Sequence, residues 1–257
     1  MPRSILDGTD LTRDAFLGGR IHLWQPRKGF RSGIDAVLLA ASVPARPGQS
    51  TLELGCGAGA ASLCLAARVP GLTLHGVELQ PNYADLARRN ASENGADLTV
   101  TTADLTNLPA DLRQQRFHHV LMNPPYFESR NGTGATDPGR ALALAGETPL
   151  ADWVDRAIRR LAPQGHLTLI QHITRLPEVL ALVSPRLGSI RVRPIQPRQN
   201  RPANLFLLQA RQEGRAPFEM LAPLGLHDGD SHDGDRESYT PQVQSILRNG
   251  AALNFGD

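Results

Sequence analysis

The sequence is poor in cysteine and has no long hydrophobic run. Its two cysteines, Cys56 and Cys64, are too few for a disulfide framework, and no histidine or cysteine stands near them at the spacing of zinc ligands. No hydrophobic run approaches the roughly 20 residues of a membrane helix, and no apolar signal core follows Met1. We therefore expect a cytoplasmic protein with two reduced cysteines, no bound metal and no membrane contact.

Lysine is also nearly absent. Lys28 is the only lysine, so arginine carries almost all of the positive charge, although the formal net charge is only +2. Arginine binds phosphates and stacks on bases, which favours a nucleic-acid partner, but a bias toward arginine can equally reflect genome composition. With 40% hydrophobic and 20% charged residues the chain is not of a disordered type, and 257 residues fit one large α/β domain with short additions.

Strand-like and helix-like segments alternate from residue 51 onward. Such alternation predicts parallel strands joined by helices that cover both faces of one sheet, which is a Rossmann-like, doubly wound α/β fold. The predicted strands are Thr51–Leu54, Leu72–Val77, Leu98–Thr101, Phe117–Met122, His166–Gln171, Ser189–Ile195 and Asn204–Ala210.

Only a few residues separate the last two predicted strands. So short a link cannot form a parallel crossover, so the last strand must run antiparallel to its neighbour. A mostly parallel seven-stranded sheet with an antiparallel last strand resembles the methyltransferase version of this fold. We expect residues 1–48 to form a hairpin and a helix that cover the cofactor site, residues 49–213 the main domain, and residues 214–257 a C-terminal extension.

A glycine-rich motif stands where the first strand of the main domain ends and a helix begins. It reads Glu53-Leu-Gly55-Cys-Gly57-Ala-Gly59, and its glycines allow a sharp turn and a close approach of the backbone to a ligand. Glu78 ends the next strand, where a carboxylate can accept hydrogen bonds from both ribose hydroxyls. The pair predicts an adenosine-containing cofactor, although such glycines also serve in ordinary turns.

Two acidic positions distinguish S-adenosylmethionine from a dinucleotide. Glu53 would repel a pyrophosphate but could lie near the cationic methionyl end of S-adenosylmethionine. Asp104 follows the third strand and could accept a hydrogen bond from the adenine amino group, while its apolar neighbour Leu105 packs against the ring. Leu79 is expected to bind the cofactor as well. Each acid alone could be a surface carboxylate or a helix cap, but together they predict one adenosine pocket.

The sequence Asn123-Pro124-Pro125-Tyr126 follows the fourth strand of the main domain. It resembles the Asn/Asp-Pro-Pro-Tyr/Phe (NPPY) motif of class I amino-methyltransferases. A conjugated exocyclic amine is a poor nucleophile, and the Asn123 oxygen and the Pro124 carbonyl could accept its two N–H groups. Tyr126 offers a face on which a base can stack. The alternative is a Pro-Pro turn that ends a buried strand.

The segment from Phe30 to Leu39, with sequence FRSGIDAVLL, resembles the one before the glycine motif in bacterial tRNA1(Val) adenine-37 N6-methyltransferases. The resemblance runs from there to the end of the last strand. It implies methylation of adenine N6 in tRNA beside the anticodon, with Gly33 and Asp35 near the methionyl part of the cofactor. Without the resemblance, Asp35 would be an acidic residue in the first turn of a helix.

Several cations are predicted to lie around the catalytic motif, because ligands of open α/β sheets bind at the carboxyl ends of the strands. Their position favours binding to the phosphates of a small structured target such as a tRNA loop. These candidate substrate-binding residues are Arg27, Lys28, Arg31, Arg193, Arg198 and Arg201, with Arg191 beside them.

Four other interpretations stay open at this point. The same tetrapeptide serves glutamine N5-methyltransferases of release factors, but these resemble one another in having a larger helical N-terminal domain. Methylation of ribosomal RNA or of DNA is possible, although the chain leaves no room for a DNA target-recognition domain. A non-catalytic cofactor-binding RNA module is the last.

Residues 128–147 could close over a substrate or be disordered, and the acidic segment 226–237 is expected to be a solvated loop.

Overall fold

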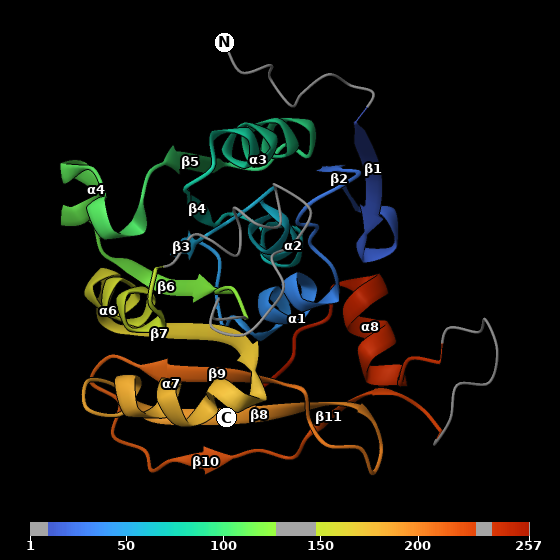
Figure 1. The fold of residues 1–257 in the computed structure, drawn as a ribbon, viewed down its shortest axis with the longest axis vertical. Coiled ribbons are helices and arrows are strands. Elements are labelled where there is room, and N and C mark those ends of the chain that lie inside the picture. The colour runs from blue at the N-terminus through green and yellow to red at the C-terminus, as the bar shows by residue number, and fades with distance from the viewer. Residues whose placement is uncertain (1–9, 127–147, 230–237, 257) are drawn as a thin grey trace, which may run out of the picture.

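A central β-sheet organises the chain in a computed structural model that describes residues 10–126, 148–229 and 238–256 (Figure 1). Among these residues the sheet has nine strands, with the order β10-β8-β9-β7-β6-β3-β4-β5 and with β11 paired to β8. The strands are β3 (Ser50–Leu54), β4 (Thr73–Glu78), β5 (Leu98–Thr102), β6 (Phe117–Met122), β7 (Leu161–His172), β8 (Gly188–Arg198), β9 (Leu205–Arg211), β10 (Glu219–Met220) and β11 (Leu224–His227).

In the central sheet all strand pairs except those of β9 are parallel, and β9 lies antiparallel between β7 and β8. This confirms the predicted mostly parallel sheet with an antiparallel last strand. The seven predicted strands are all present, but the count was too low. The short strands β10 and β11 extend the sheet beyond β8, so part of the predicted C-terminal extension belongs to the central sheet.

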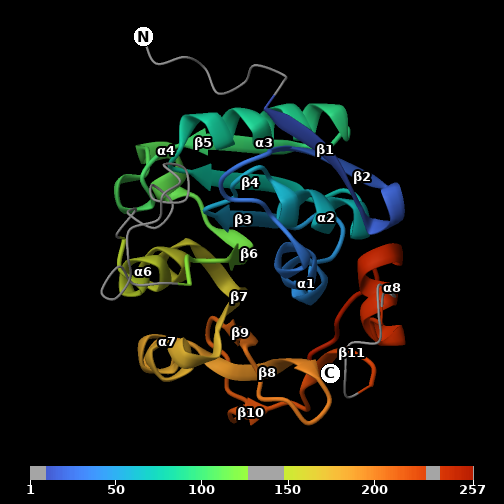
Figure 2. The ribbon, with the colours of Figure 1, turned by 45° about the vertical axis from the view of Figure 1, so that its right-hand side comes forward.

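Helices cover both faces of the sheet (Figure 2). Alternate residues of β6 show the two layers, because Leu121 packs with α1, α2 and α8, whereas Val120 and Met122 pack with α4, α6 and α7. Parallel strands covered on both faces have to be apolar on both sides, as the run in β6 is. The helices are α1 (Ile34–Ser42), α2 (Ala60–Arg68), α3 (Pro81–Glu93), α4 (Ala110–Gln114), α6 (Leu150–Arg160), α7 (Leu176–Val183) and α8 (Pro241–Asn249).

The N-terminal hairpin packs beside the main sheet and forms a separate two-stranded sheet of β1 (Leu11–Phe16) and β2 (Ile21–Pro26). Asn90 of α3 and Asn94, which directly follows α3, attach it. Asn90 Oδ1 accepts a hydrogen bond from Trp24 N at 2.8 Å, and Asn94 Oδ1 accepts one from His22 N at 3.0 Å. These side chains accept hydrogen bonds from backbone N–H groups at the edge of β2 that no other strand pairs with. The bonds hold the hairpin, and the segment that follows it, against the main domain.

Both cysteines are free and buried. Cys56 packs on β4, where a Cβ on Gly76 would lie 2.8 Å from its sulfur. Burial raises the pKa of the Cys64 thiol to about 12 and also raises that of Cys56. Both therefore stay protonated and act in packing, as predicted. Within the described ranges, no helix is long and apolar enough to cross a membrane, and no group of His, Cys, Asp and Glu could hold a metal.

Candidate cofactor and catalytic site

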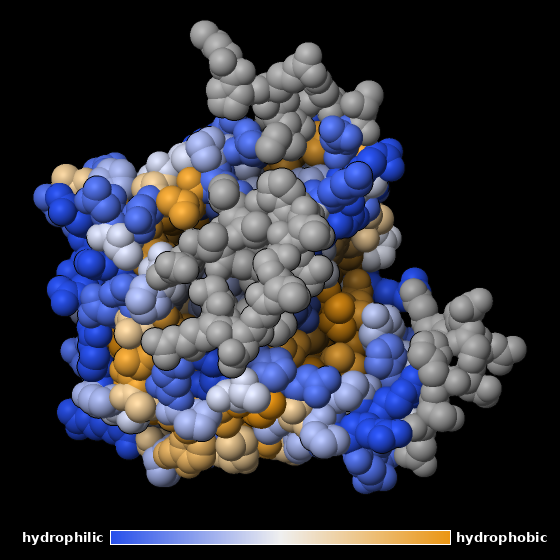
Figure 3. Space-filling model, viewed as in Figure 1, coloured by the Kyte–Doolittle hydropathy of each residue, from blue (hydrophilic) through white to orange (hydrophobic). Residues whose placement is uncertain are grey.

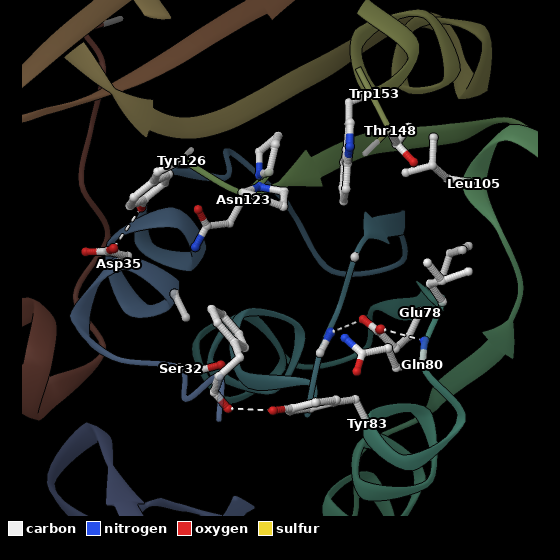
Figure 4. Close-up of a pocket in the computed structure, with 18 of the residues that line it drawn as sticks. Ser32, Asp35, Glu78, Gln80, Tyr83, Leu105, Asn123, Tyr126, Thr148 and Trp153 are labelled. Atoms are coloured by element: carbon white, nitrogen blue, oxygen red, sulfur yellow. Dashed lines mark hydrogen bonds between the residues drawn. The ribbon is translucent and has the colours of Figure 1, made fainter. Parts of the chain in front are cut away.

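A cavity of about 470 Å³ lies at the carboxyl ends of β3, β4, β5 and β6. Its volume is in the range of small-molecule sites. Most of the predicted site residues meet there (Figure 4). The predicted residues that line it are Arg31, Gly33, Asp35, Gly55, Gly57, Glu78, Leu79, Asp104, Leu105, Asn123, Pro124, Pro125 and Tyr126.

The glycine turn and Glu78 form one unit at the floor of the cavity. Gly55 and Gly57 have φ of 68° and 54°, a conformation that favours glycine. The carboxylate of Glu78 accepts hydrogen bonds from Gly57 N and Gln80 N, both at 2.9 Å. Burial raises the pKa of Glu78, and these backbone donors oppose that shift. Backbone amides thus orient the carboxylate toward the cavity.

Asp104 lies farther along the same wall, at the start of a short 3-10 helix, η2 (Leu105–Asn107). Its Oδ1 accepts hydrogen bonds from both the backbone nitrogen and the hydroxyl of Thr106 at 2.8 Å. Leu105 is buried beside it, whereas Leu79 is 52% exposed. The two leucines and the two acids therefore give this end of the cavity an apolar surface with carboxylates at its margin.

Two of the predicted cofactor residues do not line the cavity. Gly59 begins α2 with φ of 87° and packs near Ala87 and Leu98. Glu53 is buried, and its Oε2 accepts hydrogen bonds from the backbone nitrogen of Ser62 at 2.9 Å and from its hydroxyl at 2.5 Å. Burial raises the pKa of Glu53 to about 7. Its direct partner is thus the first turn of α2, beneath the glycine turn.

The tetrapeptide places two polar side chains on the opposite wall. Tyr126 donates a hydrogen bond from Oη to Asp35 Oδ2 at 2.7 Å, and this bond joins the end of the motif to the first turn of α1. Burial and the Asp35 carboxylate raise the pKa of Tyr126, which therefore stays protonated. The Oδ1 atom of Asn123 is buried and has no hydrogen-bond partner among the described residues. It is an acceptor without a donor.

Gln171 supports the turn that carries these residues, and no sequence pattern predicted this role. It is fully buried on β7, and its Nε2 donates to the carbonyl oxygens of Pro124 at 3.2 Å and Pro125 at 3.4 Å. Its Oε1 accepts from His172 N. A carbonyl oxygen has two lone pairs, so the Pro124 carbonyl can accept another hydrogen bond.

Three aromatic residues complete the cavity and were also not predicted. The indole of Trp153 covers Gly55, where a Cβ would lie 2.5 Å from its Cη2 atom. Tyr83 donates from Oη to Phe30 O at 2.9 Å, and the rings of Phe30 and Tyr83 meet edge to face. Phe30 is 44% exposed although it lines the cavity. Its exposure and its approach to Gly57 depend on the fold, so no sequence signal could have identified it.

The predicted cations differ in exposure. Arg27, Lys28, Arg31 and Arg201 are exposed, and Arg201 lies in the turn after β8, whereas Arg193 and Arg198 are partly buried. Three of the six make contacts within the chain that bear on their role. Arg31 forms an ion pair with Asp14 at 2.5 Å, while Arg193 and Arg198 donate to backbone carbonyls of the C-terminal segments.

The chain is similar to known methyltransferases in sequence and structure. Residues 32–181 match the model of the methyltransferase small domain. A tRNA1(Val) (adenine(37)-N6)-methyltransferase of Porphyromonas gingivalis is 34% identical over 196 residues, which cover 70% of this chain and 76% of the relative. The enzyme of the same name from Dickeya chrysanthemi is 32% identical over 228 residues, with 86% and 88% coverage.

Solved structures show the same fold. The crystal structure of a predicted O-methyltransferase from Agrobacterium tumefaciens is 29% identical, with a TM-score of 0.69 over 85% of this chain and 98% of that one. An S-adenosylmethionine-dependent O-methyltransferase from Thermotoga maritima has a TM-score of 0.52 at 16% identity, over 74% and 69% of the two chains.

Proposed function

The chain belongs to the methyltransferase small domain family and is an S-adenosylmethionine-dependent methyltransferase, and from that premise we propose that it methylates the N6 amino group of an adenine in tRNA. The observation that carries this proposal is the buried, unpartnered Oδ1 atom of Asn123 at the wall of the cavity. A buried acceptor without a donor is costly unless a ligand supplies the donor.

The residues of the cavity fit S-adenosylmethionine. Glu78 would accept from the ribose hydroxyls, and Asp104 from the adenine amino group, between the apolar side chains of Leu79 and Leu105. Gly55 and Gly57 leave room for the ligand because they lack a Cβ. When bound, the cofactor supplies an electrophilic methyl group on a sulfonium. Glu53 would act from beneath the glycine turn rather than by direct contact.

An amine nucleophile suits this site better than an oxygen nucleophile. The Asn123 oxygen would accept one N–H of the substrate amine, and the free lone pair of the Pro124 carbonyl the other. Two acceptors hold an amine so that its nitrogen lone pair points toward the methyl group. An oxygen nucleophile has at most one hydrogen and would leave one acceptor unpaired. Tyr126 supplies a ring for stacking of the base.

The assignment of tRNA adenine rests on the relatives. Both the Porphyromonas and the Dickeya proteins carry the name tRNA1(Val) (adenine(37)-N6)-methyltransferase. The exposed cations Lys28 and Arg201 at the margins of the site suit phosphates of a folded RNA. We also propose that the protein acts in the cytoplasm, where a tRNA substrate would be met.

Transfer of a tritiated methyl group onto four substrates tests the proposal. The purified chain would be incubated in parallel with total tRNA, ribosomal RNA, DNA and protein. We expect label in tRNA, and N6-methyladenosine as the labelled nucleoside after digestion. Label mainly in protein, ribosomal RNA or DNA would contradict the proposal and identify that class as the substrate. Label in none of the four would indicate a non-catalytic module.

A further inference from the structure

Three polar side chains from separate parts of the chain meet on one wall of the cavity (Figure 4). Asp35 lies in the first turn of α1, Asn123 directly follows β6, and Tyr126 ends the tetrapeptide. Tyr126 Oη donates to Asp35 Oδ2 at 2.7 Å and also interacts with the side-chain amide of Asn123. These contacts link the three residues in the order Asp35, Tyr126, Asn123.

The chemistry of the three groups gives this series of contacts a direction. A tyrosine hydroxyl has one hydrogen, and a carboxylate only accepts, so Asp35 takes that hydrogen. Toward Asn123, the tyrosine oxygen therefore offers only lone pairs. The Asn123 amide must then turn its NH2 group to Tyr126, which leaves its oxygen for another partner. In the structure that oxygen is buried and has no partner within the described residues.

We propose that Asp35 is a positioning residue that acts through Tyr126 to hold the Asn123 amide with its oxygen toward the substrate. The inference rests on the proposed function, because it concerns the same amine acceptor. It makes Asp35 a determinant of specificity. An oxygen held in this way binds an N–H donor, whereas a flipped amide would present NH2 and favour an acceptor such as a keto oxygen.

The resemblance to tRNA methyltransferases implies another role for Asp35, namely contact with the methionyl part of the cofactor. The two roles predict different losses. A residue that only binds the cofactor would lower cofactor affinity and leave the rate at saturating cofactor nearly normal. A residue that positions Asn123 would lower the rate at saturating cofactor and leave cofactor affinity nearly unchanged.

A double-mutant cycle of Asp35→Ala and Tyr126→Phe separates these roles, because the positioning role makes an unusual prediction. Without Asp35, the Tyr126 hydroxyl is free to donate to the Asn123 oxygen and so occupies the acceptor. Removing that hydroxyl as well should partly restore the rate. The readouts are the single-turnover rate on an unmodified tRNA transcript at saturating cofactor, and cofactor affinity from calorimetry on the same proteins.

We expect Asp35→Ala to lower the rate about a hundredfold, and Tyr126→Phe and the double variant about tenfold each, with cofactor affinity changed less than about threefold. Asp35→Asn keeps an accepting oxygen and should fall between Asp35→Ala and the parent. Tyr239→Phe is the matched control, since Tyr239 stacks on His227 near α8 and does not line the cavity. A double variant slower than Asp35→Ala, or a loss confined to cofactor affinity, would overturn the inference.

A measurement without substrate keeps the test independent of the proposed function. The side-chain amide resonance of Asn123 can be followed by NMR in asparagine-labelled protein with demethylated cofactor, and assigned from its loss in Asn123→Ala. It should shift in Asp35→Ala and Tyr126→Phe and stay in place in Tyr239→Phe. An unchanged resonance in the first two rejects the inference. If the parent protein methylates no tRNA while the resonance shifts as expected, the proposed substrate alone is wrong.

Discussion

At the scale of single residues, the sequence located most of the site because the acids and the tetrapeptide follow strand ends. Glu78, Asp104 and Asn123 could be placed in this way, since the carboxyl ends of parallel strands meet at one edge. Gln171 could not be predicted, because its role depends on the register between β6 and β7 rather than on any local pattern. The burial of Glu53 depends in the same way on how α2 packs over β3.

Glu53 makes stability depend on pH in a way that a substitution should reveal. Its pKa is raised by burial from 4.5 to about 7, so between these values the folded protein holds a proton that the unfolded chain has released. Stability therefore falls as pH rises through this window, by up to about 1.4 kcal/mol per pH unit for one such group. Glu53→Gln removes the titration and keeps an acceptor for Ser62.

The free energy of unfolding from urea titrations at pH 5, 6 and 7 is the measurement. The gain of Glu53→Gln over the parent protein should grow with pH, and the exposed Glu178→Gln should show no such trend. A difference between proteins is needed because His119 and His166 act in the opposite sense. Burial lowers their pKa values to about 3 and about 4, so they reduce stability as pH falls below 6.5. A constant gain for Glu53→Gln would contradict the raised pKa.

Gly55 is the residue at which a single methyl group should do most damage to the cavity. A Cβ there would lie 2.5 Å from the buried indole of Trp153, in a backbone with φ of 68°. The strain alone costs on the order of 1–3 kcal/mol. Gly55→Ala should lower the melting temperature and weaken binding of demethylated cofactor, measured by calorimetry. Gly33→Ala is the control for stability, because its Cβ would meet nothing within 4 Å; equal melting temperatures would refute this packing argument.

At the scale of elements, the strands with continuous apolar runs were predictable and the irregular ones were not. The strand predicted at His166–Gln171 is the second half of β7, which already begins at Leu161. Pro163 and Gly165 suggest a turn, but this stretch stays paired through an irregularity opposite β6. The strands β10 and β11 were missed because they are only two and four residues long, too short for a pattern to be recognised.

Arg193 is expected to stabilise these added elements. Its Nη1 donates to Ala222 O at 3.0 Å and its Nη2 to Asn254 O at 2.9 Å, and the guanidinium lies over the ring of Phe255. Hydrogen bonds to a charged group contribute roughly 1.5–3 kcal/mol, so Arg193→Ala should lower the free energy of unfolding by about that amount. Urea unfolding measures it. If the variant instead stays fully stable but loses RNA affinity, the result would contradict this structural role and support the substrate-binding role predicted from the sequence.

At the scale of the whole molecule, the antiparallel strand β9 brings the end of β8 to the same edge of the sheet as the catalytic motif. Ile195 of β8 pairs with Leu205 of β9, and Leu205 also pairs with His172 at the end of β7. The exposed Arg201 therefore lies on this edge. Hydrophilic residues also dominate the margin beside α4 and α6 (Figure 3), where Arg113, Arg116 and Arg159 are exposed.

Salt dependence distinguishes these two surfaces. If the edge that carries the catalytic motif binds the tRNA, Lys28→Ala with Arg201→Ala should lower RNA affinity and reduce the slope of log affinity against log salt by about 1 per lost contact. The same pair of changes at Arg113 and Arg116 is the matched comparison and should have a smaller effect. The reverse order would show that the RNA extends over α4 and α6 instead.

Asn123, as the acceptor for the substrate amine, is central to the proposed function. The most direct test is single-turnover methyl transfer by Asn123→Ala onto an unmodified tRNA transcript, with cofactor affinity measured by calorimetry on the same protein. We predict that the rate of N6-methyladenosine formation falls about a hundredfold or more while cofactor affinity changes little. Near-normal transfer by Asn123→Ala would contradict it and would reduce the tetrapeptide to a turn at the end of β6.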